Sequence, residues 1–327
     1  MKITSTGSAA FINYLGDGSH IKDLKLENID VRAEKYAAAL VLEPGDNILI
    51  ENVEVSGKVQ SSSYAAGLVF ETYDGTVIKN CVNYAEIVSG RSAGILCWPN
   101  NTVSIENVAN YGKVTGSIGA AGIANRFQGT MKNAVNRGDI RAEGIEPAAG
   151  VVGIQNGTST YEYCYNYGGV VSITDNPNSS AAGILGQTPG TKASLNYCAN
   201  YGNITAEKSY AAGIAYGLSA SLIDASYCYN EGNISGGDAA GGIAPKAQYG
   251  NGNNKAAYSI NSGNITSAGK TYQVSDKNIE CYYYSGEELK DANDNKLVES
   301  QVALSKLNAG NDNNFFTILS NGKIGVK

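Results

Sequence analysis

The sequence predicts an all-β protein, a parallel β-helix of about nine or ten coils that ends in a short helical or irregular C-terminal cap. Two recurring phrases and one feature of the composition support this prediction. The phrases repeat with a period of roughly 27 to 34 residues over most of the 327-residue chain. The chain also holds 40 glycines and 6 prolines, which favours many tight turns over proline-rich disorder.

The first phrase is of the type Ala-Ala-Gly-Ile and occurs once in each repeat. The intervals between its successive glycines are 27, 28, 28, 33, 30 and 29 residues. A period of this size indicates a solenoid, in which each unit buries its apolar face only against its neighbours. The copies lie at 65–68, 92–95, 120–123, 148–151, 181–184, 211–214 and 240–243.

The segments between these phrases have the character of strands. They are short, alternate with a period of two, and hold Val, Ile, Tyr and Thr. Three short strands in each coil predict a parallel β-helix. The phrase of leucine-rich repeats is missing, and propeller blades usually need about 40 residues or more. Residues 35–40 look like a degenerate earlier unit, and residues 11–31 like a first coil.

The second phrase is Asn-x-Gly-x-Ile or a close variant, and it predicts a ladder of asparagines. Neighbouring parallel strands lie about 4.8 Å apart, so equivalent residues stack along the axis. Stacked amides can donate to one neighbour and accept from the other, which satisfies polar groups that a lone buried Asn would leave unpaired. The predicted ladder is Asn83, Asn110, Asn136, Asn166, Asn200, Asn230 and Asn261.

Five cysteines share the position two residues before the ladder asparagine or its equivalent. They are Cys81, Cys164, Cys198, Cys228 and Cys281. Val108, Ala134 and Ser259 take this place in other coils, so the column favours a small side chain, and we expect buried reduced thiols. The chain has one histidine and no Cys-x-x-Cys, which argues against a zinc site.

These phrases resemble a known family. Gly183-Ile184-Leu185-Gly186, followed by the segment from Leu195 to Ile204, is similar to the GLUG-type repeats of bacterial cell-surface proteins. The likeness covers roughly residues 8 to 270, although Cys97, Asn125 and Pro245 replace the last glycine of the motif. It implies a right-handed β-helix in a secreted or surface-anchored protein, often of gut bacteria, with adhesive or glycan-related roles.

Composition limits the class of partner. A net charge of −6 argues against nucleic acid and against an anionic membrane surface. No apolar run approaches the roughly 18 residues of a membrane span, so we expect no membrane insertion. Met1 leads directly into polar sequence without a signal peptide, and the first coil begins in mid-phrase. We therefore expect a piece of a longer secreted or cell-surface chain.

The spacing changes near Tyr272, which divides the chain into β-helix repeats at 1–271 and a last coil with its cap at 272–327. Residues 300–310 predict a short helix with Ser300 as N-cap and Gly310 just past its end. Its apolar face is expected to cover the last coil, because an open solenoid end invites aggregation. Phe315 and Phe316 predict a final strand. The stretch 291–295 resembles the start of a calcium loop, but Lys296 and Val302 stand where that loop needs Gly and Glu. No metal and no cofactor are expected.

One column varies where the structural columns repeat, and it predicts a binding site. The residue four places after each repeat glycine is Glu71, Trp98 or Arg126 in three successive coils. With Tyr73, these side chains offer a stacking plane and charged hydrogen-bonding groups, which suit a sugar. An ordinary variable loop is the competing interpretation.

Two further patterns have an orientation that the sequence leaves open. Two columns of tyrosines, one containing Tyr84, Tyr111, Tyr167 and Tyr201 and the other Tyr163, Tyr197, Tyr227 and Tyr258, face either outward or into the core. The small residues Ala120, Gly122 and Ala124, and their equivalents around Gly213, form a smooth stripe for association if they face out.

Three functions fit these observations. A non-catalytic extracellular module that binds a glycan or a surface protein is preferred. A polysaccharide lyase or glycoside hydrolase of the β-helix type is the first alternative, but no acidic column is found and no catalytic residue is predicted. A structural stalk is the second alternative.

Overall fold

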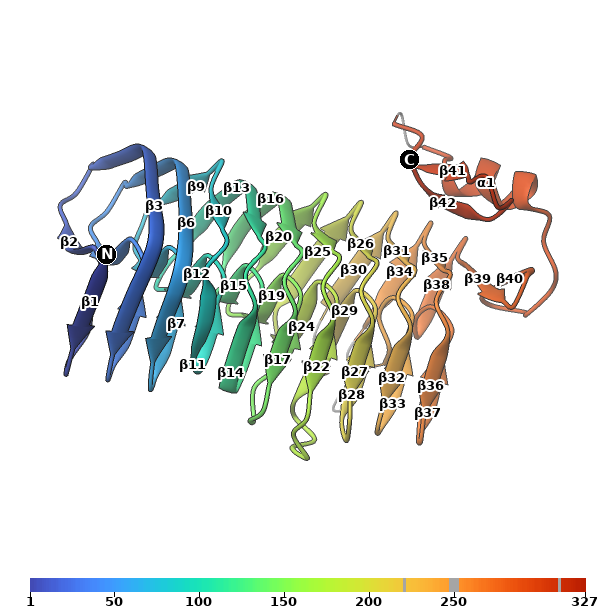
Figure 1. Cartoon of the computed structure of the whole chain (residues 1–327). Helices are drawn as coiled ribbons and strands as arrows, with labels where there is room; N and C mark the ends of the chain where they lie inside the picture. Colours follow the sequence, from blue (N-terminus) through green and yellow to red (C-terminus); the bar gives the residue numbers. More distant parts are fainter. Residues whose placement is uncertain (220–221, 247–252, 311–312) are drawn as a thin grey trace.

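The computed structural model is a right-handed parallel β-helix of about nine turns, which confirms the predicted fold class (Figure 1). The structure describes residues 1–219, 222–246, 253–310 and 313–327. The coils stack along one axis from the N-terminus, and each coil has three arms, here called A, B and C.

Arm A follows the asparagine position and contains the Ala-Ala segment. Its strands are β1 (Lys2–Ser5), β4 (Tyr36–Ala38), β7 (Tyr64–Ala66), β11 (Glu86–Ala93), β14 (Val114–Ala121), β17 (Ile140–Ala142), β18 (Ala148–Ala149), β22 (Val170–Ser172), β23 (Ser180–Ala182), β27 (Ile204–Ala206), β28 (Tyr210–Ala212), β32 (Ile234–Gly236), β33 (Ala239–Gly241), β36 (Ile265–Ser267) and β37 (Lys270–Tyr272).

Arm B follows the repeat glycine and forms its own sheet. Its strands are β2 (Ile12–Leu15), β5 (Val41–Pro44), β8 (Val69–Thr72), β12 (Leu96–Pro99), β15 (Ala124–Phe127), β19 (Val152–Gln155), β24 (Leu185–Pro189) and β29 (Ala215–Ser219).

Arm C leads to the next asparagine position. Its strands are β9 (Val77–Lys79), β10 (Val82–Asn83), β13 (Val103–Asn110), β16 (Gly129–Asn136), β20 (Ser159–Glu162), β21 (Tyr165–Asn166), β25 (Lys192–Asn196), β26 (Ala199–Asn200), β30 (Leu222–Ser226), β31 (Tyr229–Asn230), β34 (Lys255–Ala257), β35 (Ile260–Asn261), β38 (Lys277–Ile279) and β39 (Tyr282–Ser285). In the first coils β3 (His20–Ala33) and β6 (Leu49–Ser61) run through arm C into arm A.

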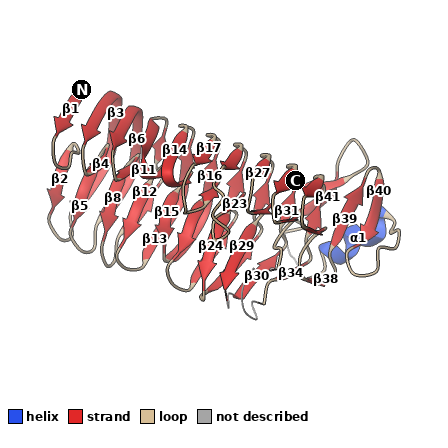
Figure 2. Cartoon of the chain, turned by 90° about the horizontal axis from the view of Figure 1, so that it is seen from below, coloured by secondary structure: helices blue, strands red, loops and turns tan. Residues whose placement is uncertain are grey.

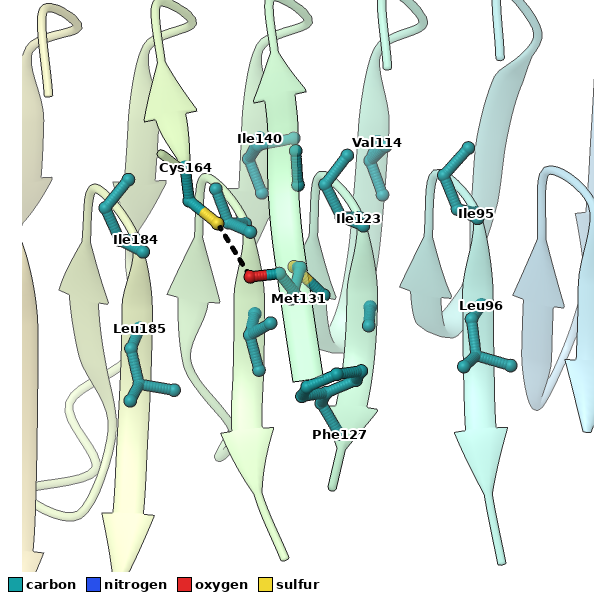
Figure 3. Packing of buried hydrophobic residues seen from close by; sticks show 14 of the residues in the cluster. Ile95, Leu96, Val114, Ile123, Phe127, Met131, Ile140, Cys164, Ile184 and Leu185 are labelled. Carbon is teal, nitrogen blue, oxygen red and sulfur yellow. Dashed lines mark hydrogen bonds between the residues drawn. The ribbon is translucent and has the colours of Figure 1, made fainter. Parts of the chain in front are cut away.

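The inside of the solenoid is an apolar core built from columns of aliphatic side chains. Figure 3 shows Ile95, Ile123 and Ile184 repeating at the same place in their coils, with Phe127 and Met131 filling the interior between the arms. The cysteine column belongs to this core. All six cysteines are buried and free, as predicted for the five in the column.

The asparagine ladder is confirmed. Hydrogen bonds of 2.7–2.8 Å between side-chain amides join each Asn from Asn83 to Asn261 to the next one along the axis. Each ladder Nδ2 also donates to the carbonyl oxygen two residues on, as from Asn166 to Gly168 O at 2.9 Å. The repeat glycine packs against this ladder, since a Cβ on Gly122 would meet the side chain of Asn136 and the carbonyl of Gly150. The two sequence phrases are therefore linked by direct contact.

The C-terminal end differs in detail from the prediction. The hairpin of β39 and β40 (Glu288–Asp291) closes the last coil. Helix α1 (Ser300–Leu307) has Glu299 rather than Ser300 at its N-cap. It is followed by an antiparallel pair, β41 (Phe316–Ile318) and β42 (Ile324–Val326), which confirms the predicted final strand. Figure 2 shows α1 at the C-terminal end of the solenoid.

The described part of residues 300–327, called the C-terminal segment below, packs on several coils and not only on the last one. Ala303, Leu307, Phe315, Phe316 and Ile324 share a buried cluster with outward side chains of four coils, namely Ala199, Tyr229, Ile260 and Tyr282. The segment therefore also lies along the outer face of arm C. Within the part of the chain that the structure describes, no helix has the length and apolar character needed to cross a membrane.

Candidate functional site

Three of the four predicted binding residues, Glu71, Trp98 and Arg126, lie on arm B at the same height of neighbouring coils, and Tyr73 follows the end of β8. Trp98 pairs in register with Glu71 on one side, and Arg126 follows in the next strand. The same column continues toward the N-terminus through Glu43 and Tyr14, which pair with each other. We call the column Tyr14, Glu43, Glu71, Trp98 and Arg126, together with Tyr73, the arm B strip.

Trp98 is held by contacts on more than one side. The guanidinium carbon of Arg126 lies 4.6 Å from the centre of its ring, a cation–π contact. The ring of Tyr64 meets the indole edge-to-face at 5.6 Å between centroids. Trp98 is half-buried, and these two contacts fix the orientation of its ring. A fixed aromatic ring loses little conformational freedom when a ligand stacks on it.

Arg126 is fixed by an ion-pair network that the sequence analysis missed. Glu146 accepts from Arg126 at 2.8 Å and from Arg91 Nε at 2.9 Å, and the three side chains are 10–21% exposed. Arg91 comes from arm A and Glu146 from the turn between β17 and β18, so no single column holds them. No periodic signal in the sequence indicates this bridge between arms.

The other end of the strip is acidic and hollowed. Tyr73 lines a hollow of about 220 Å³ together with Tyr14, Asp17, Glu43 and Asp46. Burial, and then the charge of the neighbouring Glu71, raises the pKa of the Tyr73 hydroxyl. Asn100 donates a hydrogen bond to the Glu71 carboxylate. The strip thus presents aromatic rings beside hydrogen-bonding groups, the combination that binds sugars.

The carboxylates of this hollow do not resemble a hydrolytic pair. Asp17, Glu43 and Asp46 are all exposed, and Asp17 already accepts a bond from the backbone N–H of Asp46 at 2.9 Å. A general acid for glycoside cleavage normally needs a shielded site that keeps its proton on. The exposed carboxylates of this hollow therefore lack the shielding that such a general acid needs.

The tyrosine column of Tyr163, Tyr197, Tyr227 and Tyr258 faces outward, and its role is structural. Successive rings stack at 5.0–5.1 Å. All four residues have φ between 49° and 57°, a conformation that costs a bulky residue about 1–2 kcal/mol. In earlier coils the same position holds asparagines, which tolerate this conformation and form a second, exposed ladder.

The C-terminal segment contacts Tyr163, Tyr197 and Tyr227 at this strained position. Tyr227 donates to the carbonyl of Ala309 at 3.2 Å, and Phe315 meets the ring of Tyr197 edge-to-face at 5.4 Å. Asn313 donates to the hydroxyl of Tyr163 at 3.1 Å. The strained backbone is thus offset by the contacts that attach the segment.

The second tyrosine column also faces outward, and Tyr84, Tyr111 and Tyr167 stay accessible, whereas Tyr201 packs against the buried cluster of the C-terminal segment. Tyr84 and Tyr111 stack at 5.0 Å and are 49% and 45% exposed. Tyr167 and Tyr201 stack at 4.7 Å, and Arg137 places its guanidinium 4.2 Å from the centre of the Tyr167 ring. Rings stacked along the axis turn their edges, not their faces, to solvent.

The sequence left open whether the small residues around Gly122 and Gly213 form an exposed stripe, and the structure places the alanines of this set inside. Ala120, Ala124, Ala211 and Ala215 are fully buried and belong to the inner core. The turn at the repeat glycine breaks the alternation, so that Ile123 and Ala124 both point inward. This stripe is not a surface for self-association.

The described residues include no group of three or more His, Cys, Asp or Glu side chains arranged to hold a metal ion. In the stretch that resembles a calcium loop, Asp294 pairs with Lys296 at 2.7 Å, and Asp291 accepts from the backbone of Asn293. These carboxylates are thus engaged in local contacts within a turn.

A further hollow lies away from the strip, toward the C-terminal coils. It measures about 590 Å³ and is lined by Tyr210, Asp238, Lys246, Lys270 and Tyr272, among others. Lys246 directly precedes residues 247–252, which lie outside the described part of the chain. We therefore assign no site to this hollow.

Comparison with known proteins identifies no family for the chain. No family model and no curated protein matches it, so the resemblance to GLUG-type repeats remains a likeness of short phrases. Among solved structures, the chain is similar to a crystal structure from Bacteroides ovatus that is provisionally described as an immunoglobulin A1 protease. The two share 15% identity with a TM-score of 0.35, and the match covers 100% of this chain and 91% of the other. A similarity of this degree carries no argument about function.

Proposed function

We propose that this chain is a non-catalytic extracellular binding module and that its ligand is a glycan held by the arm B strip. The observation that carries the proposal is the contact of Trp98 with Arg126, beside Glu71 and the hollow at Tyr73. A sugar ring would stack on the aromatic surface while its hydroxyls bond to the carboxylates and amides around it.

The shape of the strip agrees with an extended ligand. Tyr14 and Trp98 lie three coils apart in one column, a separation of about 14 Å at 4.8 Å for each coil. The carboxylates of Glu43 and Glu71 lie between them. A short oligosaccharide that runs parallel to the solenoid axis would contact both aromatic ends and hydrogen-bond in between.

The location outside the cell is part of the proposal. It rests on the resemblance of residues 183–204 to repeats of bacterial surface proteins, and the buried free thiols are compatible with it because burial protects them from oxidation. Antibody labelling of intact cells of the source organism tests whether the protein is outside the cell. A signal seen only after lysis would refute this part.

The binding test is a panel of plant, microbial and host glycans with the wild-type chain and the variant Trp98→Ala. We expect saturable binding that Trp98→Ala weakens about tenfold or more, because the main stacking surface is lost. Leu297→Ala is the control, since Leu297 is 66% exposed and lies in the link between the β39–β40 hairpin and α1.

Equal binding by the wild type and Trp98→Ala would refute the site. Absence of binding to every glycan would favour a protein ligand or a structural stalk. Release of new reducing ends from any polysaccharide of the panel would replace the binding proposal with the hydrolase alternative.

A further inference from the structure

A second aromatic surface lies on the outer side of arm C, away from the arm B strip. Tyr84 is the first tyrosine of its column, with one ring face stacked on Tyr111 at 5.0 Å and an interplanar angle of 18°. The preceding coil has Ser56 in register with Tyr84, because Asn83 pairs with Val55. The small serine leaves the second face of the Tyr84 ring without an aromatic neighbour.

That free face borders a hollow of about 220 Å³. Its lining includes Lys25, Glu27, Glu54 and Ser56 in addition to Tyr84. Lys25 Nζ lies 3.0 Å from Glu27 and 3.6 Å from Glu54, so one ammonium group bridges the two carboxylates. The hollow therefore combines an aromatic face with both acceptors and a donor, and its net charge is negative.

A β-bulge shapes this place. The pairing of β3 with β6 shifts between Leu26 and Ile29, so that two residues of β3 oppose Ser56 alone. The extra residue Asn28 has φ of 50°, and its backbone N–H donates to Ser56 Oγ at 3.2 Å. This hydrogen bond holds the Ser56 side chain against the bulge.

We propose that this hollow is a second glycan-binding site, specific for a neutral pyranose of an oligosaccharide. The sugar ring would stack on the free face of Tyr84, with its hydroxyls donating to Glu27 and Glu54 and accepting from Lys25. A uronic acid would meet two carboxylates and be disfavoured. The site uses other residues and another face than the arm B strip, so it goes beyond the function proposed above.

The choice of a neutral sugar follows from the groups already paired. A cationic ligand would have to displace Lys25 from both carboxylates, whereas a hydroxyl can bond to their remaining lone pairs. The position at the end of the stack matters as well. Tyr111 is covered by Tyr84 on one face, so Tyr84 alone offers its face at this end of the pair.

The test uses cellotetraose and tetragalacturonate as probes, with titration calorimetry on the full chain. To isolate this site, binding is measured in Trp98→Ala and in Trp98→Ala combined with Tyr84→Ala. We expect cellotetraose affinity to be about tenfold lower in the double variant than in Trp98→Ala. Trp98→Ala combined with Tyr84→Phe keeps the ring, so its affinity should stay within about threefold of that of Trp98→Ala. Glu54→Gln is expected to weaken binding about threefold to tenfold, because the hydrogen bond loses its charge.

Tyr84 is 49% exposed, so its truncation should leave the fold intact, and a thermal melt checks this. Equal affinity of the single and double variants, or tighter binding of tetragalacturonate than of cellotetraose at this site, would overturn the proposal. Loss of all binding in Trp98→Ala alone would also overturn it while leaving the arm B strip standing. Binding that survives Trp98→Ala but fails in Tyr84→Ala would support this site and count against the strip.

Discussion

Replacing Asn166 by alanine tests whether the buried asparagine ladder stabilises the stack of coils. Asn166 lies near the middle of the ladder and is fully buried. It accepts from Asn136 at 2.8 Å, donates to Asn200 at 2.8 Å, and donates to the carbonyl of Gly168 at 2.9 Å. The alanine variant would lose all three bonds at once.

The expected cost follows from the groups left behind. The side-chain oxygen of Asn200 and the carbonyl oxygen of Gly168 would lose a donor inside the protein, and each such loss costs about 1–3 kcal/mol. Asn136 keeps its bond to Gly138 and loses one of two. We therefore expect the free energy of unfolding to fall by about 3–5 kcal/mol. Asn261 ends the ladder and takes part in two such bonds, so Asn261→Ala should cost less.

Urea denaturation followed by circular dichroism measures these differences. Asn107→Gly is the matched control, because Asn107 belongs to the exposed ladder and has φ of 53°, which glycine adopts without strain. Its stability should stay within about 0.5 kcal/mol of the wild type. If Asn166→Ala were as stable as this control, the ladder would be a by-product of the repeat and not a source of stability.

Two further predictions concern the ion-pair network and the thiols. Glu146→Gln should lower the free energy of unfolding by about 1–3 kcal/mol in urea titrations, since two guanidinium groups would lose their shared carboxylate. Glu143 is in an exposed pair with Arg141, so Glu143→Gln should cost less than about 1 kcal/mol. Equal effects of the two variants would contradict the buried bridge. Burial raises the pKa of the Cys81 thiol to about 11 and that of Cys281 to about 12, from 9.0, so their contribution to stability is complete below pH 9 and is lost as the pH rises toward those values. Urea midpoints at pH 8 and pH 10.5 measure this loss, which Cys81→Val should reduce, and a midpoint that does not fall with pH would contradict it.

The periodic positions were predictable because a solenoid converts sequence spacing directly into columns. The asparagine ladder and the cysteine column both appear at the predicted residues, because stacking at a fixed period places equivalent residues of successive repeats next to each other. The column of Glu71, Trp98 and Arg126 was predicted on the same basis, and its neighbours in space agree.

The orientation of side chains near the turns was not predictable. Alternation along a strand predicts opposite faces for Ile123 and Ala124, yet both point inward because the chain turns at Gly122. The tyrosines with positive φ break a local preference, and three of them, Tyr163, Tyr197 and Tyr227, contact a distant part of the chain.

By itself, the sequence determined the fold, the number of coils to within about one, and the residues that stack along the axis. These properties depend on contacts between residues one period apart, and the same residue types recur in each repeat. Only the tertiary structure decided which faces are covered and how the arms are joined. Glu146 bridges two arms, and the C-terminal segment returns to Tyr227 and Tyr163 across 82 and 150 residues of sequence. Such contacts occur once in the chain, so no repetition in the sequence indicates them.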